Sequence, residues 1–213
     1  MASQKQIIDT IKTAKIVAII RGIDSDHILK TAEALIKGGI KVMEITLNRD
    51  DAMKSIEIVK KEFENEILLG AGTVLTDKQV REANQHGACF IVSPNTDEVV
   101  IKQTKDLNMI SIPGAFSPTE IVKAHQLGAD FVKVFPVGNV GPGYIKAVRG
   151  PLDNIPLLAV GGVNLNNMTE FLKAGADGLG IGGNLVDKSL IYAGKYDEVE
   201  KIARSYVKKL EEV

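Results

Sequence analysis

The feature that most constrains the fold of this chain is a regular alternation of short apolar runs with longer amphipathic stretches. Eight runs rich in Val, Ile, Leu and Phe end in Gly, Pro or a polar residue, as buried parallel strands do; they cover 15–22, 41–48, 66–75, 89–95, 108–116, 130–137, 156–163 and 178–186. Stretches with helical spacing of apolar residues lie at 26–39, 51–63, 76–87, 117–128, 164–175 and 195–213. Strands that alternate with helices predict a parallel α/β protein.

The number and spacing of the strands favour a closed (β/α)8 barrel, the TIM-barrel fold, with eight parallel strands. The repeat is regular at roughly 20–26 residues per unit, which is compact for that fold. The alternative is an open doubly wound sheet, but the glycine-rich fingerprint of a dinucleotide-binding sheet is missing, because the first strand ends in RGIDSD. The chain has 213 residues and no linker, so we expect a single domain that spans 1–213.

Composition argues against several classes of function. The net charge is −1, whereas proteins that bind nucleic acid or a membrane surface usually carry a basic excess. No apolar run is long enough to span a bilayer, and the polar N-terminus does not resemble a signal peptide. The single cysteine, Cys89, cannot form an intramolecular disulfide, which indicates a cytoplasmic chain. The three histidines lack the spacing of metal ligands, so no metal site is predicted.

Two charged residues lie within strands that are otherwise apolar. In a barrel the active site forms at the C-terminal ends of the strands, and successive side chains alternate between the two faces of a strand. Glu44 alternates with Met43 and Ile45, and Lys133 alternates with Val132 and Val134. Because the apolar set should pack under the helices, we expect Glu44 and Lys133 to face each other inside the barrel.

This pair has two interpretations. A buried structural salt bridge is possible, but desolvation of two charges often outweighs their attraction. The other interpretation is chemical: burial lowers the pKa of a lysine, and a neutral amine can form a Schiff base with a ketone while a neighbouring glutamate moves protons. A charged Glu44 would raise the pKa of Lys133, so this hypothesis requires that burial dominates or that the two groups do not touch.

Two glycine pairs end the last two strands, in AVGGVN and GIGGNL. Barrels often bind phosphate at this place, because backbone N–H groups and a helix N-terminus point at the anion. The alternative is that the glycines only permit tight turns with positive φ. Two such pairs in adjacent positions favour phosphate binding.

The chain closely resembles the 2-keto-3-deoxy-6-phosphogluconate (KDPG) aldolase family nearly from end to end. The matching motifs are VAIIRG, EITL, GAGTVL, FIVSPN, IPGAFSPTE, KVFP, GPGYIKAVRGP and GGVN. The resemblance implies a (β/α)8 class I aldolase, a lyase that uses a Schiff base and no metal or other cofactor. It further implies that a 2-keto-3-deoxy-6-phospho sugar acid is cleaved to pyruvate and D-glyceraldehyde 3-phosphate, in carbohydrate metabolism of the Entner–Doudoroff type, by a homotrimer.

The resemblance also implies roles for individual residues. Lys133 matches the Schiff-base lysine, and Glu44 matches the glutamate that acts as general acid and base through a water. The remaining matches are Arg21 for the substrate carboxylate, Thr73, Pro94 and Phe135 around pyruvate, and Gly161, Gly162, Gly182, Gly183 and Asn184 at the phosphate.

This chain departs from the gluconate-type pattern at three positions. Asn48 stands where arginine usually follows EITL, and Arg49, one residue later, should point the other way. Val160 replaces a threonine before the first glycine pair, and Asn184 replaces a serine at the phosphate. Asn48 and Val160 resemble the related 2-dehydro-3-deoxy-6-phosphogalactonate aldolases, so either sugar acid can be the substrate. The family also implies cleavage of 4-hydroxy-2-oxoglutarate (KHG) to pyruvate and glyoxylate.

Two further hypotheses come from other classes. Phosphate-binding barrels that act as isomerases or synthases share the terminal glycine pattern but need no Schiff-base lysine. A non-catalytic scaffold derived from an aldolase trimer is the other alternative, although both Lys133 and Glu44 are retained here.

Overall fold

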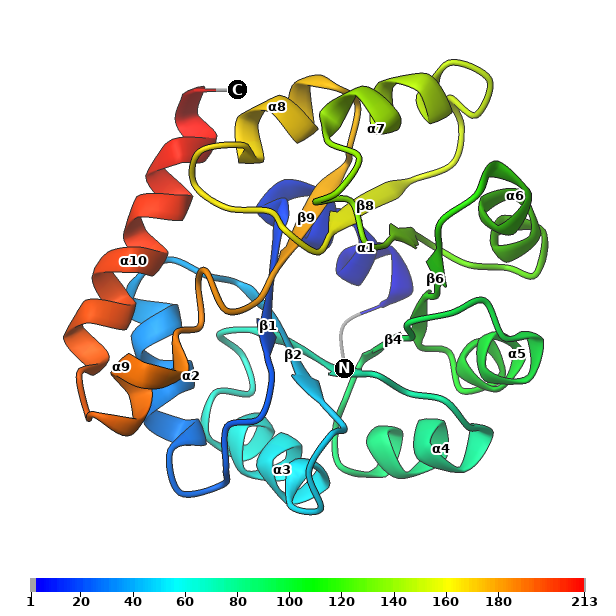
Figure 1. Ribbon diagram of the computed structural model, residues 1–213. Coiled ribbons are helices and arrows are strands. Elements are labelled where there is room, and N and C mark those ends of the chain that lie inside the picture. Colours follow the sequence, from blue (N-terminus) through cyan, green and yellow to red (C-terminus); the bar gives the residue numbers. More distant parts are fainter. Residues whose placement is uncertain (1–2, 213) are drawn as a thin grey trace.

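Parallel strands form a nearly closed ring at the centre of the computed structural model, which describes residues 3–212 (Figure 1). The strands are β1 (Ile16–Ile20), β2 (Val42–Thr46), β3 (Leu68–Gly72), β4 (Phe90–Val92), β5 (Ile110–Ile112), β6 (Gly114–Ala115), β7 (Val132–Val134), β8 (Leu157–Val160) and β9 (Gly178–Ile181). Their order is β5-β4-β3-β2-β1-β9-β8-β7-β6, and every pair is parallel. The TIM-barrel prediction is therefore confirmed. Residues 1, 2 and 213, at the ends of the predicted domain, lie outside the described residues.

The predicted count of eight strands is wrong, because the run at 108–116 forms two strands. Pro113 separates β5 from β6, and proline has no N–H to contribute to a ladder. β5 pairs with β4, whereas β6 pairs with β7. The carbonyl of Pro113 still accepts a hydrogen bond of 2.9 Å from the Lys133 N–H. β5 and β6 are the two end strands of the sheet, and Pro113 links them covalently. The backbone therefore closes the ring at this point, in place of a pair of strands.

Helices surround the ring (Figure 1). They are α1 (Gln4–Ala14), α2 (Ile28–Lys37), α3 (Ala52–Glu62), α4 (Asp77–Gln85), α5 (Glu98–Asp106), α6 (Pro118–Gln126), α7 (Pro142–Arg149), α8 (Met168–Lys173), α9 (Lys188–Tyr192) and α10 (Tyr196–Lys209), followed by a 3-10 turn at Leu210–Glu212. Helices α1, α5, α7 and α9 lie in stretches for which the sequence analysis predicted no individual helix. Among the described residues, no helix is both long and apolar enough to cross a membrane.

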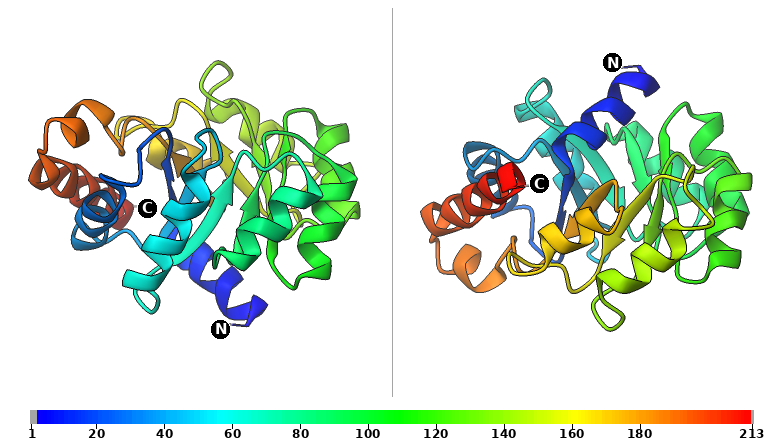
Figure 2. Two further views of the ribbon diagram at one scale, coloured as in Figure 1. Left: turned by 90° about the horizontal axis from the view of Figure 1, so that it is seen from below. Right: turned by 90° about the horizontal axis from the view of Figure 1, so that it is seen from above.

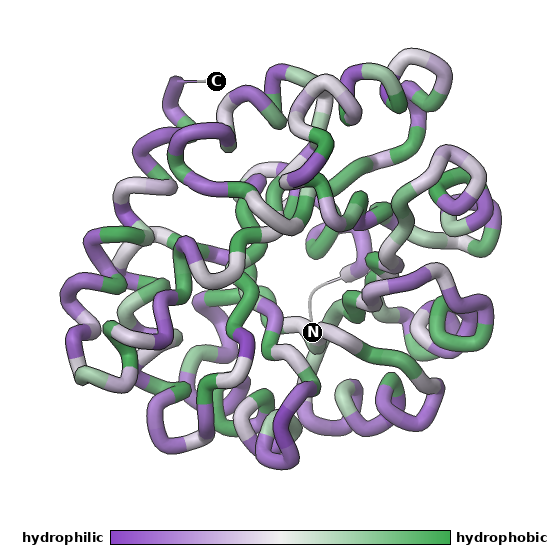
Figure 3. Tube along the Cα trace, in the orientation of Figure 1, coloured by the Kyte–Doolittle hydropathy of each residue, from purple (hydrophilic) through white to green (hydrophobic). Residues whose placement is uncertain are grey.

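Two apolar cores hold the barrel together. The larger core lies between the strands and the surrounding helices, and it includes Met43 and Ile45 of β2. The smaller core fills the barrel interior, where Ile7 and Ile11 of α1 pack against strand residues such as Phe90 and Phe131. Helix α1 thus covers the N-terminal end of the barrel (Figure 2). Figure 3 shows apolar residues along the strands and polar residues around the outside of the helices.

Candidate active site

Glu44 of β2 and Lys133 of β7 both face the barrel interior, as the alternation predicts. They line one narrow cavity together with Val17, Ile19, Val92, Ile112, Leu158, Val160 and Gly180. Only 2% of the surface of Glu44 and 4% of that of Lys133 is exposed. The volume of the cavity is about 10 Å3, which is roughly the room that one water molecule requires.

Burial is the largest cause of the pKa shifts of both groups. It lowers the pKa of Lys133, an effect that the negative charge of Glu44 opposes and the positive charge of Arg21 reinforces. Burial raises the pKa of Glu44, against the opposing charges of Lys133 and Arg21. Within residues 3–212, no ion pair of 4.0 Å or less joins Glu44 to Lys133. The arrangement therefore favours a neutral amine beside a carboxyl group that retains a proton more readily than an exposed one.

Phe135 follows β7 beside the lysine. The ammonium nitrogen of Lys133 lies 4.9 Å from the centroid of the Phe135 ring. The same ring approaches the first glycine turn, because a Cβ atom on Gly161 would lie 3.0 Å from it. Phe135 thus forms a wall between the lysine and the end of β8.

Gly72 makes room for the Glu44 carboxyl group. A Cβ atom on Gly72 would lie 2.5 Å from Oε1 of Glu44 and 2.8 Å from Cδ, closer than van der Waals contact allows. The sequence analysis assigned no role to Gly72, although a glycine inside a strand often marks such a close approach. The absence of a side chain at position 72 therefore determines where the carboxyl group lies.

The remaining predicted residues surround the mouth of the barrel. Arg21 and Asn48 are exposed at the ends of β1 and β2, and Thr73 and Pro94 are half-buried after β3 and β4. Thr73 has a φ of 58°, which is unusual for a β-branched residue. Such a strained backbone is found mainly where function requires it, so it supports a role for Thr73 at the site.

The two glycine turns differ. Gly161 and Gly162 have φ values of 88° and 87°, and a Cβ atom on Gly162 would lie 2.6 Å from Cα of Gly138. The turn therefore requires glycine at these positions, in agreement with the alternative that these glycines permit a tight turn with positive φ. A Cβ atom on Gly183 would meet nothing within 4 Å, and neither Gly182 nor Gly183 has a positive φ. Geometry does not require glycine there, which favours an open surface for a ligand.

Asn184 connects the two turns. Its Nδ2 donates a hydrogen bond of 2.9 Å to the carbonyl of Val163, just after the first glycine pair. The side chain therefore fixes the two turns relative to each other.

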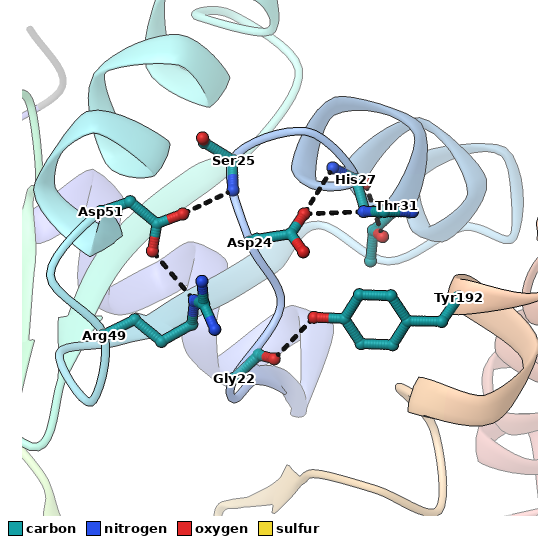
Figure 4. A network of polar contacts seen from close by, with 8 residues as sticks. All are labelled: Gly22, Asp24, Ser25, His27, Thr31, Arg49, Asp51 and Tyr192. Carbon is teal, nitrogen blue, oxygen red and sulfur yellow. Dashed lines mark hydrogen bonds and ion pairs between the residues drawn. The ribbon is translucent and has the colours of Figure 1, made fainter.

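The segment after β1 is held by side chains from two other parts of the chain (Figure 4). Asp51 accepts hydrogen bonds from the Ser25 N–H at 2.8 Å and from Nε of Arg49 at 2.9 Å. The hydroxyl group of Tyr192, on α9, donates to the carbonyl of Gly22 at 3.1 Å. Arg49 thus pairs with Asp51. This agrees with the expectation that Arg49 does not take the part of the arginine that gluconate-type relatives carry at the position of Asn48.

Lys188 is a cation at the mouth that the sequence analysis did not identify. A Cβ atom on Gly22 would lie 2.5 Å from Nζ of Lys188 and 3.7 Å from Nδ2 of Asn48. The start of α9 therefore brings an ammonium group beside Asn48. No local signal in the sequence connects position 188 to position 22, because only the folded barrel makes them neighbours.

Within residues 3–212 there is no cluster of His, Cys, Asp or Glu that could hold a metal ion.

Comparison with known proteins identifies relatives along most of the chain. The family model described as KDPG and KHG aldolase matches residues 7–202. The chain is 34% identical to 2-dehydro-3-deoxy-phosphogluconate aldolase of Haemophilus influenzae, over 95% of this chain and 96% of that protein. It is 37% identical to 2-dehydro-3-deoxy-6-phosphogalactonate aldolase of Escherichia coli, over 80% of this chain and 83% of that protein.

A solved structure shares the fold and is related in sequence. KDPG aldolase from Legionella pneumophila, with pyruvate captured as a covalent carbinolamine, superimposes with a TM-score of 0.87 at 27% identity, over 93% of this chain and 97% of that one.

Proposed function

This chain belongs to the KDPG and KHG aldolase family, and we propose that it cleaves a 2-keto-3-deoxy-6-phospho sugar acid to pyruvate and D-glyceraldehyde 3-phosphate through a Schiff base on Lys133. The observation that carries this proposal is a lysine with a lowered pKa, buried in one cavity with a glutamate of raised pKa. A neutral amine attacks ketones, and a protonated carboxyl group can supply the proton that dehydration needs.

The mechanism uses these two groups in turn, and one water molecule carries protons between Glu44 and the reacting atoms. The Lys133 amine adds to the C2 ketone and forms a carbinolamine; Glu44 protonates the departing hydroxyl group, water leaves, and an iminium forms. The iminium accepts the electrons of the C3–C4 bond as that bond breaks, while the C4 hydroxyl gives its proton to the Glu44 carboxylate and the aldehyde departs. Glu44 then protonates C3 of the pyruvate enamine, which restores an iminium. Water hydrolyses this iminium and gives its proton back to the Glu44 carboxylate, so that pyruvate and the neutral amine are released.

The residues at the mouth hold the substrate in this proposal. Arg21 binds the carboxylate, since a guanidinium group suits that ion and lies close enough to influence the pKa values of both Lys133 and Glu44. Thr73, Pro94 and Phe135 enclose the pyruvate portion. The glycine turns and Asn184 bind the phosphate at the far end, which positions the C3–C4 bond over the amine.

Two residues bear on the choice of sugar acid. Val160 lines the cavity beside Lys133 with methyl groups, where a hydroxyl would offer a hydrogen bond. Asn48 is exposed at the mouth and carries no charge. Both features favour the galactonate-type substrate, and the gluconate type is the alternative. Comparing kcat/KM for the two epimers, and for 4-hydroxy-2-oxoglutarate, decides between them.

Borohydride trapping tests the chemistry. The protein is mixed with pyruvate, reduced and digested, and we expect one adduct, on Lys133, by mass spectrometry. The Lys133→Ala variant should fold, form no adduct and lose turnover. An adduct on another lysine, or turnover by Lys133→Ala, would contradict the mechanism. A folded protein that forms no adduct would instead support a phosphate-binding isomerase or a non-catalytic scaffold.

A homotrimer is part of the same proposal. Leu75, Val99, Phe116 and Val140 are exposed apolar residues in segments that follow strands at the mouth side of the barrel, and 60% of Val99 is exposed. Exposed apolar side chains such as these are where we expect the chains of a trimer to meet, because burial of apolar surface stabilises contacts between proteins. Light scattering should give three times the mass of one chain, and Val99→Lys combined with Phe116→Lys should lower it. The cytoplasmic location stays a prediction.

A further inference from the structure

Thr46, the last residue of β2, carries a buried hydroxyl group without a partner. Its exposed surface is 3%, and among the described residues nothing forms a hydrogen bond with its Oγ1. Two other buried threonines are satisfied locally: Thr31 donates to the carbonyl of His27 at 2.9 Å, and Thr104 to that of Val100 at 2.7 Å. An unpaired buried hydroxyl group is unfavourable, and valine would fit a strand equally well. The hydroxyl at position 46 therefore needs an explanation other than stability.

The position of Thr46 supplies one. Alternation along β2 places it on the interior face, two residues beyond Glu44 towards the mouth of the barrel. Thr46 pairs in register with Gly72 of β3, and it is over Gly72 that the Glu44 carboxyl group lies. Neighbouring strands are about 4.8 Å apart, so the hydroxyl and the carboxyl group occupy the same layer. No direct hydrogen bond joins them in the described structure, which leaves the hydroxyl free for a third group.

We propose that Thr46 is a positioning residue whose hydroxyl group donates a hydrogen bond to the water through which Glu44 exchanges protons with the reacting atoms. This proposal rests on the proposed aldolase function. Thr46 keeps its own proton throughout, because Glu44 is the group that gains and loses one. A water held by both side chains would be fixed in position between the carboxyl group and the substrate, which lowers the barrier for proton transfer.

The test compares Thr46→Val with Thr46→Ser. Thr46→Val removes only the hydroxyl, and we expect unchanged or higher resistance to urea, kcat lower by roughly 10- to 100-fold, and KM changed by less than about two-fold. Thr46→Ser restores a hydroxyl and should recover most of kcat. The matched control is Ser55→Ala on α3, since Ser55 is also a buried hydroxyl without a partner but lies on a helix outside the strand ring. Ser55→Ala should leave kcat unchanged.

Each other outcome is decisive. If Thr46→Val keeps the wild-type kcat, or if Thr46→Ser is as slow as Thr46→Val, Thr46 does not position a proton-carrying water. Equal losses of kcat in Thr46→Val and Ser55→Ala would mean that both act through the fold, which also overturns the proposal. Pyruvate trapping separates this result from failure of the proposed function: an adduct on Lys133 in the wild-type protein upholds the aldolase mechanism whatever Thr46 does.

Discussion

The protonation of the Lys133 amine depends on three competing effects. Burial lowers its pKa and is the largest effect, Glu44 raises it, and Arg21 lowers it. Because Glu44 forms no ion pair of 4.0 Å or less with Lys133, its attraction does not cancel the loss of hydration. The barrel interior thus favours the neutral amine that a Schiff base requires.

These effects predict opposite responses to two substitutions. The neutral fraction of the amine rises with pH, and its midpoint should lie below the reference value of 10.5 because the pKa is lowered. Arg21→Gln removes a charge that lowers this pKa, so the midpoint should rise. Glu44→Gln removes a charge that raises it, so the midpoint should fall. The measurement is the rate of borohydride trapping at saturating pyruvate across a series of pH values. Shifts in the same direction for both variants would contradict this account.

At the scale of elements, glycines on two strands leave space that larger side chains from neighbouring strands occupy. In β3 the interior positions are Gly70 and Gly72, which face the Phe90 ring and the Glu44 carboxyl group. In β9 they are Gly178 and Gly180, and side chains of β8 lie against both. A barrel of this size is filled by side chains, so small residues on one strand must match large ones on the next. The match between Gly72 and the larger side chain of Glu44 leaves room for the carboxyl group inside the barrel.

Gly72→Ala should therefore impair catalysis more than folding. The added methyl group would overlap the Glu44 carboxyl group, which must move away from its position. We expect kcat to fall by at least about ten-fold, since proton transfer depends on the placement of the carboxyl group. Gly143→Ala on α7 is the control, because a Cβ atom there meets nothing within 4 Å. A Gly72→Ala variant with full activity would show that the carboxyl group is not fixed by β3.

At the scale of the whole molecule, two partly buried networks of polar contacts and the candidate active site lie at opposite ends of the barrel. Just before β7, Asp130 accepts hydrogen bonds from the Ser111 N–H and from Lys105. Just before β9, Asp177 accepts them from the Leu157 N–H and from Arg149. Both aspartates thus join a strand to a helix at the N-terminal end, the end that α1 covers. The candidate site residues lie at the C-terminal end, so we expect the two ends to vary independently.

Arg149→Lys tests this separation. The guanidinium group of Arg149 donates to Gly175, Ile155 and Asp177 at 2.6–2.9 Å, a set that one ammonium group cannot reproduce. Urea denaturation should show a loss of about 1–3 kcal/mol in the free energy of unfolding, while kcat of the folded enzyme stays unchanged. Lys201→Ala, which removes only an exposed pair with Glu198, should have little effect. A large loss of kcat in Arg149→Lys would show that the two ends are coupled.

The sequence by itself determined the parallel α/β architecture, the barrel, and the inward direction of Glu44 and Lys133. These follow from the two-residue period of a strand and from the places where apolar runs end, which are properties of neighbouring residues. The division of one predicted strand into β5 and β6 also has a local cause, since proline at 113 has no N–H for a ladder. That this division lies where the ring closes follows only from the order of strands in the sheet.

Only the tertiary structure decided which side chains meet. The contact of Glu44 with Gly72, the approach of Lys188 to Gly22, and the isolation of the Thr46 hydroxyl all join positions on different strands or loops. Such contacts depend on strand register and ring closure, which place residues far apart in the chain in one layer. The pKa values of Lys133 and Glu44 depend on the same assembly, because burial, their largest cause, exists only once the whole ring has closed around them.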